Sequence, residues 1–267
     1  MLEITSPQNS LIKEITSLKT KKGRWSRQSY IVEGIKIVRE ALKIEGLVQS
    51  LVFSDASFKS AAAVEIAELF KSKVSMVRLS DKLYSQLTGM ENPQGILAVL
   101  GMRNRNIGDI KENGRWIYLD GLQDPGNCGT IIRSTDAFAF DGIILGKGCV
   151  DPYNPKVVQA SMGSILRVGL YFSSSSDIEL GYLLNIGFRL ISASTDGSDR
   201  LTNFDFSNRD IIVIGNEGSG ISNKILDLSS HRISIPMPGN AESLNAGVAA
   251  SLIMYEAACK PRISVEF

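Results

Sequence analysis

The sequence predicts an α/β protein of two domains, the second of which is built on a mainly parallel sheet. Three observations support this prediction: short helical and strand-like segments alternate over the first hundred residues, a polar stretch follows, and from Trp116 onward apolar strands are each followed by a glycine-marked turn. Strands that are apolar on both faces and alternate with helices are typical of a parallel sheet covered on both sides. Because ligands of such sheets bind where the strands end at their carboxyl edge, the turns are the first candidates for chemistry.

Composition sets outer limits on the kind of protein. The 267 residues, 43% of them apolar, suffice for two compact domains. No stretch approaches the roughly 18 apolar residues of a membrane span, and the start lacks the apolar core of a secretory signal, so we expect a cytoplasmic protein without a membrane partner. Cys128, Cys149 and Cys259 lie far apart without metal-ligand spacing, which predicts reduced thiols and no metal site.

The first domain is expected over residues 1–104, followed by a linker over 105–114, which is polar and rich in glycine and asparagine. Residues 115–267 form the expected second domain. Helical spacing and strand-like runs place the elements of the first domain. The predicted helices are 8–18, 35–42, 61–70 and a short one after Ser80, and the predicted strands are 29–33, 47–53, 74–79 and 95–100.

A basic cluster lies near the N-terminus. It can neutralise RNA phosphates while the nearby Trp25 offers a ring for stacking on bases. It can equally be a solvated loop between two elements, and the 29 basic against 28 acidic residues of the whole chain do not decide between the two. The cluster comprises Lys19, Lys21, Lys22, Arg24 and Arg27.

The first glycine-marked turn of the second domain follows a strand that ends at Asp120 and reads DGLQDPGNCGTIIRSTDAFAF. We expect Asn127 to cap a helix and Arg133, one to two turns further along, to point toward the strand ends. Each residue also has a simpler interpretation. Asn127 can be a cap and nothing more, and Arg133 can form an ordinary surface salt bridge.

The second turn, IIVIGNEGSGIS, is rich in glycine but is not a dinucleotide fingerprint. The spacing of Gly215, Gly218 and Gly220 does not fit, and the carboxylate of Glu217 stands where a pyrophosphate would approach. We therefore expect a ligand that is neutral or cationic at this point. A nicotinamide-dependent oxidoreductase, one alternative for the chain, is disfavoured.

The third turn, ISIPMPGNAESLNAGVAASLIMYEAA, leads into a long helix that we expect Ser243 to cap. Leu244, Val248, Leu252 and Tyr255 recur at near-helical spacing and predict a buried apolar face. A buried terminal helix does not explain the polar Asn245 at its start. No nucleophile elbow accompanies His231, the single histidine, so a hydrolase triad has no support.

Taken in order, NCGTIIRSTDAF, IGNEGSGIS and IPMPGNAESLNAGVA resemble the three signature motifs of the SpoU (TrmH) family of RNA 2′-O-ribose methyltransferases. At the N-terminus, SPQNSLIKEITSLKTKKGR, YIVEG and NPQGILAV resemble the ribosomal protein L30e-like, RNA-binding module of its rRNA-directed members. The resemblance implies a SPOUT-type second domain with a deep trefoil knot, S-adenosylmethionine as cofactor, a homodimer formed through the knotted domain, and 23S rRNA as the expected substrate. Two alternatives remain: a tRNA 2′-O-methyltransferase, and a non-catalytic RNA-binding or ribosome-assembly protein on the same fold.

The resemblance also implies roles for individual residues. Arg133 takes the place of the family's catalytic arginine, and because guanidinium holds its proton we expect it to orient the ribose hydroxyl and stabilise charge. Glu217 either attracts the cofactor's sulfonium or braces its turn. Where family members often read SLNVSVA, this chain has Ala246 and Gly247. The implied catalytic positions are Arg133, Asn127, Glu217, Ser243 and Asn245, the cofactor positions Ser194, Thr195, Ile214, Gly215, Asn216, Gly220, Ile235, Met237 and Leu244, and the RNA-binding positions are those of the basic cluster.

Overall fold

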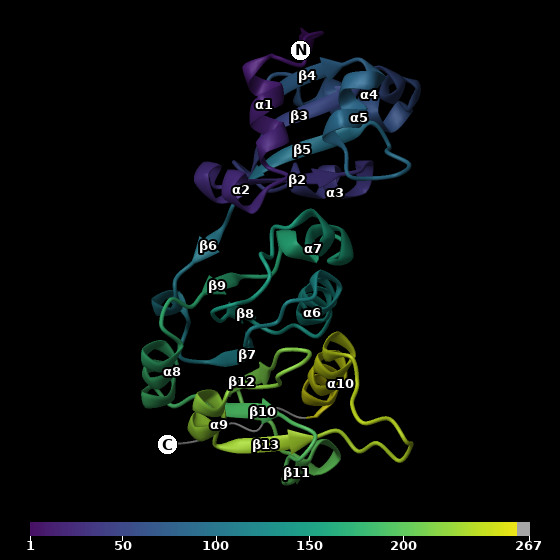
Figure 1. Ribbon diagram of the computed structural model, residues 1–267. Helices are drawn as coiled ribbons and strands as arrows, with labels where there is room; N and C mark the ends of the chain where they lie inside the picture. The colour runs from purple at the N-terminus through teal and green to yellow at the C-terminus, as the bar shows by residue number, and fades with distance from the viewer. Residues whose placement is uncertain (261–267) are drawn as a thin grey trace. The chain divides into compact units, whose positions relative to one another are not determined.

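The computed structural model describes residues 1–260, apart from the side chains of residues 176 and 177. The chain divides into two compact units (Figure 1). Unit 1 comprises Met1–Met102 with Tyr153–Gln159, and unit 2 comprises Arg103–Pro152 with the residues from Ala160 onward. Helix α7 (Pro155–Ala160) thus groups largely with unit 1, although the sequence places it within the second domain.

Unit 1 contains a five-stranded sheet in the order β1-β4-β3-β5-β2. Strands β1, β4 and β3 are parallel, and β5 runs antiparallel to both β3 and β2. The predicted helices and strands are all present, within a residue or two of their expected ends, together with β1 and α2, which the sequence analysis did not predict. The elements are β1 (Leu2–Ile4), α1 (Ser10–Ser17), α2 (Lys21–Arg27), β2 (Ser29–Glu33), α3 (Ile35–Ala41), β3 (Val48–Ser54), α4 (Ala61–Phe70), β4 (Ser75–Leu79), α5 (Asp81–Leu87) and β5 (Ile96–Gly101), with a 3₁₀ turn at Asp55–Lys59.

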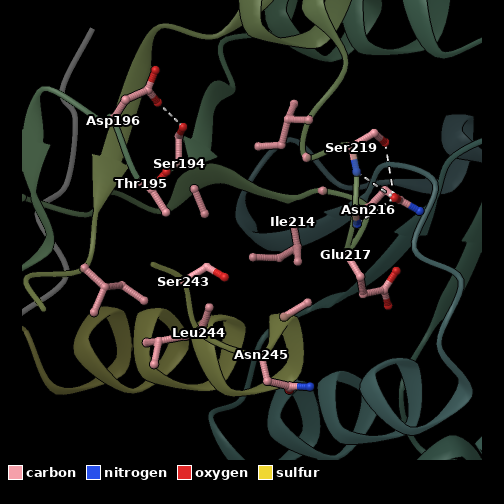
Figure 2. Close-up of a pocket in the computed structure, with 18 of the residues that line it drawn as sticks. Ser194, Thr195, Asp196, Ile214, Asn216, Glu217, Ser219, Ser243, Leu244 and Asn245 are labelled. Carbon is pink, nitrogen blue, oxygen red and sulfur yellow. Dashed lines mark hydrogen bonds between the residues drawn. The ribbon is translucent and has the colours of Figure 1, made fainter. Parts of the chain in front are cut away.

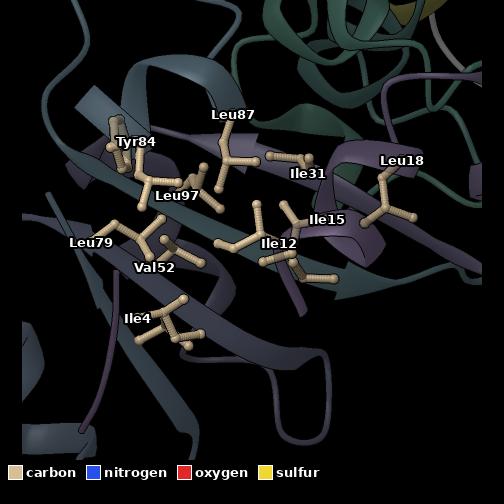
Figure 3. Close-up of a cluster of buried hydrophobic side chains, with 13 residues drawn as sticks. Ile4, Ile12, Ile15, Leu18, Ile31, Val52, Leu79, Tyr84, Leu87 and Leu97 are labelled. Carbon is tan, nitrogen blue, oxygen red and sulfur yellow. The ribbon is translucent and has the colours of Figure 1, made fainter. Parts of the chain in front are cut away.

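The core of unit 1 lies between its sheet and the helices α1 and α5 (Figure 3). Ile12 and Ile15 of α1 and Leu83 and Leu87 of α5 pack on Val52 and other side chains from the same face of the sheet. The neighbours of Val52 in the strand, Leu51 and Phe53, are also buried, because alternate residues of a strand point to opposite faces and α3 and α4 cover the second face.

Unit 2 is built on an eight-stranded sheet in the order β11-β13-β10-β12-β7-β8-β9-β6. Every neighbouring strand pair in the described part of this sheet is parallel, so the predicted α/β class with a mainly parallel sheet is confirmed. The three short strands β6, β9 and β11 are additions to the prediction. The strands are β6 (Asn104–Arg105), β7 (Gly114–Leu119), β8 (Gly142–Leu145), β9 (Leu170–Phe172), β10 (Arg189–Ala193), β11 (Asp199–Arg200), β12 (Arg209–Ile214) and β13 (His231–Ser234).

Helices cover both faces of this sheet (Figure 1). Helices α8 (Ser176–Asn185) and α9 (Asn223–Leu228) pack on one face, where Leu183 and Ile225 join Tyr118 and Val213 in a buried cluster. Helices α6 (Pro125–Ala137) and α10 (Ala246–Cys259) lie against each other on the opposite face. Short 3₁₀ turns occupy Ile107–Asp109, Ser164–Leu166 and Leu201–Asn203. The sheet therefore has the two-sided cover that its apolar strands require.

The stretch 105–114, expected as a linker, carries structure of its own in unit 2. Asn104 and Arg105 form the edge strand β6, which pairs with β9, and Ile107 and Ile110 are buried in the core of the unit. Polar residues surround these two isoleucines in the sequence, so the stretch lacks the apolar periodicity that would have predicted its packing.

The prediction of a buried apolar face on the last helix is wrong. Val248, Leu252 and Tyr255 of α10 are 47%, 42% and 53% exposed, whereas Ala250, Ile253, Met254 and Ala257 are buried. The helix is apolar nearly all round, so the sequence could not show which stripe faces the sheet. Together with Leu244, which precedes the helix, these three exposed residues form the α10 stripe.

Candidate active site

A pocket of about 860 Å³ opens at the carboxyl edge of the unit 2 sheet (Figure 2). Its walls come from the turns that follow β10, β12 and β13, from the start of α10, and from Asn127 of α6. These turns are far apart in the sequence but meet because parallel strands end together at one edge. Among the lining residues are Ser194, Thr195, Asp196, Ile214, Gly215, Asn216, Glu217, Gly220, Ile235, Met237, Ser243, Leu244 and Asn245.

The turn after β12 is tied together by its own backbone and by Asn216. Asn216 and Gly220 exchange two backbone hydrogen bonds of 3.0 Å, and the Asn216 side-chain oxygen accepts from the amides of Gly218 and Ser219. A Cβ atom at Gly215 would overlap the backbone of Gly220 and Ile221, so only glycine fits there. The glycines of this motif serve a closed turn that presents main chain to the pocket.

Glu217 connects this turn to the loop before α6. Its Oε2 accepts a hydrogen bond of 3.1 Å from the amide of Gln123, and its Oε1 accepts from the amide of Asp124 and from Asn127 Nδ2, both at 3.0 Å. Partial burial acts to raise the pKa of the Glu217 carboxyl, but these hydrogen bonds together hold that pKa below its usual value. Glu217 is therefore a carboxylate with both oxygens engaged, which favours the bracing role of the two predicted.

The cap of α6 is Asp124, not Asn127 as predicted. The Asp124 side chain accepts a hydrogen bond of 2.7 Å from the Asn127 amide, and Pro125 occupies the first helical position, where its missing N–H is harmless. Asn127 is buried within the first turn, which leaves its side-chain amide free to reach Glu217 and the pocket.

The third turn also differs from the prediction in its cap. Asn245, not Ser243, caps α10, and its Oδ1 accepts from the amides of Gly247 at 3.0 Å and Val248 at 3.2 Å. This capping role explains why a polar residue, Asn245, stands at the start of an apolar helix. Ser243 lies in the preceding segment and lines the pocket.

Gly247, where this chain departs from the common motif, lies against α6. A Cβ atom at this position would lie 3.1 Å from Cβ of Thr130 and 3.2 Å from its Cγ2, which is closer than side chains normally approach. The glycine thus allows α10 and α6 to pack closely where Thr130 faces it. No hydroxyl at position 247 is available to the pocket.

Asp196 is a lining residue that the sequence analysis missed. It follows β10 in the run ASTDG, and Ser194 Oγ donates a hydrogen bond to its Oδ1. That hydrogen bond is the main cause that lowers the pKa of the Asp196 carboxyl. An aspartate before a glycine at the carboxyl end of a parallel strand was the signal that could have identified it.

The charge of the pocket has one sign. Asp196 and Glu217 contribute carboxylates, and no lysine or arginine stands among its described lining residues. Backbone of the glycine turn and the apolar side chains of Ile214, Ile235 and Leu244 complete the walls. Such a pocket suits a ligand with an apolar, hydrogen-bonding body and positive charge, and it disfavours pyrophosphate.

Arg133 is the one predicted catalytic residue that the pocket lining does not include. It lies exposed on α6, and no hydrogen bond or ion pair of Arg133 is found in the described part of the chain. The predicted surface salt bridge is therefore not seen, and the orientation of Arg133 toward the strand ends stays a prediction. The guanidinium is available to a partner molecule.

The basic cluster divides into an exposed part and a buried residue. Lys21 and Lys22 are exposed at the start of α2, Lys19 donates to the carbonyl of Gln86 at 2.7 Å, and Arg27 forms a 2.6 Å ion pair with Glu14. Arg24 is only 3% exposed, and its guanidinium donates to the carbonyls of Leu18 and Lys19 at the end of α1. The prediction that Arg24 contacts RNA does not fit this burial, because its hydrogen bonds hold α1 and α2 together.

Other reactive groups lie outside the pocket. Burial raises the pKa of the Cys149 thiol to about 11, so this thiol is neutral at physiological pH. His231 lies 3.3 Å from Asp199, and its ring contacts Phe204. In the described range, residues 1–260, no three His, Cys, Asp or Glu residues are grouped to hold a metal ion, and no helix is long and apolar enough to cross a membrane.

Comparison with known proteins shows similarity over both parts of the chain. The model of the SpoU rRNA Methylase family matches residues 114–255, and that of the MRM3-like substrate binding domain matches residues 9–98. The 23S rRNA (guanosine(2553)-2′-O)-methyltransferase RlmP of Bacillus subtilis is 29% identical over 96% of this chain and 98% of its own length. A 23S rRNA (uridine(2479)-2′-O)-methyltransferase of Streptomyces viridochromogenes is 30% identical over 88% of this chain and 84% of its own.

Solved structures are similar over the same span. The AdoMet-bound rRNA methyltransferase of Sinorhizobium meliloti aligns with a TM-score of 0.83 at 29% identity, covering 96% of each chain. The SpoU methyltransferase AviRb of Streptomyces viridochromogenes, in complex with AdoMet, aligns with a TM-score of 0.85 at 28% identity, covering 94% of this chain and 97% of that one.

Proposed function

Because this chain belongs to the SpoU rRNA methylase family, we propose that it is an RNA 2′-O-methyltransferase that transfers a methyl group from S-adenosylmethionine to a ribose 2′-hydroxyl of 23S rRNA. Relatives that align over most of its length are named for this reaction, and two of the similar structures contain the cofactor. We further propose that it acts in the cytoplasm, where rRNA of this kind is found.

The observation that supports this function best is the charge of the pocket. S-adenosylmethionine carries positive charge on its sulfur and its amino group, and the pocket offers the carboxylates of Asp196 and Glu217 with no basic residue among its described lining. The backbone of the turn at Gly215 and Asn216 and the apolar side chains of Ile235 and Leu244 fit an adenosine body. A nicotinamide dinucleotide would place its phosphates against the same carboxylates, which speaks against the oxidoreductase.

In the reaction, S-adenosylmethionine supplies a methyl group made electrophilic by its positively charged sulfur. The ribose 2′-oxygen attacks that methyl, the carbon–sulfur bond breaks with its electron pair left on sulfur, and the hydroxyl proton passes to water or to a phosphate oxygen of the RNA. Arg133 keeps its own proton, since the guanidinium pKa exceeds about 12. It therefore orients the hydroxyl and stabilises the negative charge that develops on the oxygen.

Asn127, Glu217 and Asn245 position this chemistry. Glu217 holds Asn127 and the loop before α6 against the glycine turn, and Asn245 fixes the start of α10 beside Ser243 and Leu244. A fixed polar frame around the methyl donor lowers the entropic cost of bringing the two substrates together.

We also propose that the enzyme is a homodimer through unit 2. The α10 stripe exposes four large apolar side chains in one row beside α6, and a stripe of this kind on a water-soluble surface marks an interaction site. A second copy covering the stripe would also stand close to the exposed Arg133 on α6.

The family implies a trefoil knot in the C-terminal domain, and two contacts support it. Arg115, in β7, donates to the carbonyl of Ala257 and, at 2.8 Å, to that of Ser207. Lys260 Nζ, just past α10, donates to the carbonyls of Thr202 at 2.9 Å and Phe204 at 3.0 Å. These contacts hold the end of α10 against β7 and the connection between β10 and β12, which is compatible with the knot that we propose. We place the RNA-binding, L30e-like domain at 1–104, the linker at 105–114 and the methyltransferase domain at 115–267.

The test is methyl transfer to defined RNA. The protein is incubated with labelled S-adenosylmethionine and protein-free 23S rRNA, 16S rRNA or tRNA, and the product is probed for a backbone bond that resists alkaline cleavage. We expect label in 23S rRNA at a single ribose. Label on a base, a preference for tRNA, or S-adenosylmethionine binding without any transfer would contradict the proposal.

A further inference from the structure

A second, smaller hollow of about 420 Å³ lies against the same glycine turn as the pocket. It lies at the carboxyl ends of β7, β8 and β12, and five of its lining residues, Asn216, Ser219, Gly220, Ile221 and Asn223, also line the pocket. The other lining residues are Asp120, Gly121, Gln123, Gly148 and Ser222. A volume of this size is within the range of small-ligand sites, about 300–1,000 Å³.

The hollow has a floor of bare backbone. Gly121, Gly148 and Gly220 all adopt positive φ angles, of 68°, 86° and 70°, so their conformations require glycine. A Cβ atom at Gly220 would meet nothing within 4 Å, and one at Gly148 would meet only Gly121 Cα at 3.8 Å. The space above these glycines is open, and exposed peptide groups allow a flat ligand to approach closely.

Three polar side chains around this floor have hydrogen-bonding capacity to spare. Asp120 uses Oδ2 to accept a 2.7 Å hydrogen bond from the Ser222 amide, and in the described part of the chain its Oδ1 has no donor. The side-chain amides of Gln123 and Asn223 likewise form no hydrogen bond with any described residue. One carboxylate oxygen and two amides are therefore available to a ligand.

The charge of the hollow decides what kind of ligand fits. Its only charged lining residue among those described is Asp120, so a phosphate would be repelled, whereas a neutral ring with N–H donors would be bound. Lys147 adjoins Gly148 and is exposed, where it can meet a phosphate of the strand that carries such a ring. Unpaired RNA bases are recognised through hydrogen bonds on their pairing edges.

We propose that this hollow binds a nucleobase of the substrate RNA and prefers one with an exocyclic amino group, which donates to Asp120 Oδ1. The inference rests on the proposed function for its substrate, and it adds a determinant of sequence preference beside the methyl-donor pocket. Cytosine, adenine and guanine carry such an amino group, whereas uracil presents a carbonyl oxygen in the place of the cytosine amino group.

Cytidine and uridine 5′-monophosphate are the sharpest pair of probes, because they differ at this one group. Each is titrated into the isotope-labelled, S-adenosylmethionine-saturated protein, and the backbone amide signals of Gly121, Gly148 and Gly220 are followed. We expect the cytidine nucleotide to shift these signals with an affinity about tenfold higher, the effect of one hydrogen bond to a charged acceptor.

Two variants sharpen the test. Asp120→Asn keeps an oxygen for the Ser222 amide but turns an NH₂ group toward the ligand, so the preference should shift to the uridine nucleotide. Gln123→Ala should weaken the binding of both nucleotides and raise KM for 23S rRNA several-fold at unchanged kcat. Asn203→Ala, an exposed polar residue of unit 2 outside the hollow, is the matched control and should change neither.

Equal affinities for the two nucleotides, signal changes away from the three glycines, or an unchanged preference in Asp120→Asn would overturn the inference. Failure of the proposed function is a separate result: the unaltered protein would then bind no S-adenosylmethionine or methylate no 23S rRNA, both of which stay intact if only the hollow is misassigned.

Discussion

The side-chain amide of Asn127 donates a 3.0 Å hydrogen bond to the carboxylate of Glu217, ninety residues later in the chain. The same carboxylate accepts from the amides of Gln123 and Asp124. The Glu217 side chain thus joins two of the three motifs that mark this family. It also fixes the position of the start of α6 relative to the turn after β12.

This connection predicts a pH-dependent contribution of Glu217 to stability. Because the pKa of its carboxyl is lowered in the folded state, the contribution is present above the unfolded-state pKa, near 4.3, and is lost as the pH falls through the folded-state value. Glu217→Gln should lower the free energy of unfolding at pH 7 by about 1 kcal/mol, a figure reduced for the residue's exposure. Denaturant melts from pH 7 to pH 3 should show the variant and the unaltered protein converging, and a difference that grows in acid would refute the bracing role.

Gly247 should tolerate a larger side chain only if Thr130 is made smaller. Gly247→Ser places a Cβ atom 3.1 Å from Cβ of Thr130 and should cost about 1–3 kcal/mol of stability. Adding Thr130→Ala should recover part of that loss, so that the double variant is less destabilised than the sum of the two single variants. Thermal melts of the four proteins measure this coupling, and strict additivity would mean that the two residues do not constrain each other.

Asp196 should contribute to cofactor affinity without supporting the fold. Asp196→Asn removes a carboxylate that lines the pocket and is otherwise exposed, so affinity for S-adenosylmethionine should fall about two- to fivefold at low salt, and less at high salt. Asp227→Asn, an exposed aspartate on α9 outside the pocket lining, serves as the control. Titration calorimetry at two ionic strengths gives the comparison, and equal losses in both variants would remove Asp196 from the site.

The α10 stripe should hold two chains together. Leu252→Glu places a charge in the middle of the stripe and should convert the dimer to a monomer in light scattering. Leu69→Glu, at an exposed leucine of α4 in unit 1, is the matched control and should leave the dimer intact. A protein that is monomeric before any substitution would rule the dimer out.

Arg133 should act in catalysis but not in binding the methyl donor. Since it does not line the pocket, Arg133→Lys should bind S-adenosylmethionine normally while its single-turnover rate falls by at least about tenfold. Full retention of that rate would show that the guanidinium is dispensable.

We expect Lys21 and Lys22 to bind RNA, whereas we expect Arg24 to stabilise the fold of unit 1. Replacing both lysines by alanine should weaken rRNA binding. It should also make the slope of log affinity against log salt concentration less steep, by the amount expected for the loss of about one to two phosphate contacts. Arg24→Ala should instead lower the stability of unit 1 by about 1–3 kcal/mol, since its guanidinium donates to two carbonyls at the end of α1. Binding measured against salt, with melts in parallel, separates the two effects.

Much of this architecture could be predicted from local patterns. Alternating and continuous apolar runs placed the main strands, and glycine-marked turns at their ends pointed to Gly215, Glu217 and Asn245, which the structure brings into one pocket. The burial of Ile107 and Ile110 within the stretch expected as a linker could not be predicted, because these two residues stand alone among polar residues in the sequence.

Predictions that needed one helix to be oriented against its neighbours were less successful. The apolar periodicity of α10 gave no reason to choose between the stripe at Leu252 and the face at Ile253, because both are apolar. Both predicted helix caps were wrong by two or three positions. Asp124 caps α6 in place of Asn127, and Asn245 caps α10 in place of Ser243, because each helix start offers two polar side chains that could cap it. Arg24 was predicted to contact RNA but is buried. Its burial could not be predicted, because no local pattern in the sequence indicates the carbonyls to which it donates.

The placement of Asn245 at the start of the last helix has a consequence for the order in which the protein matures. The pocket obtains one wall from the residues that lead into α10. The end of this helix is fixed by the hydrogen bond from Arg115 to the carbonyl of Ala257 and by that from Lys260 to the carbonyl of Thr202. A nascent chain that ends just after β13 would have every strand of its larger sheet yet no closed cavity for the methyl donor. Competence to modify RNA would then arrive only once α10 has been made, and chains without this helix would stay inactive.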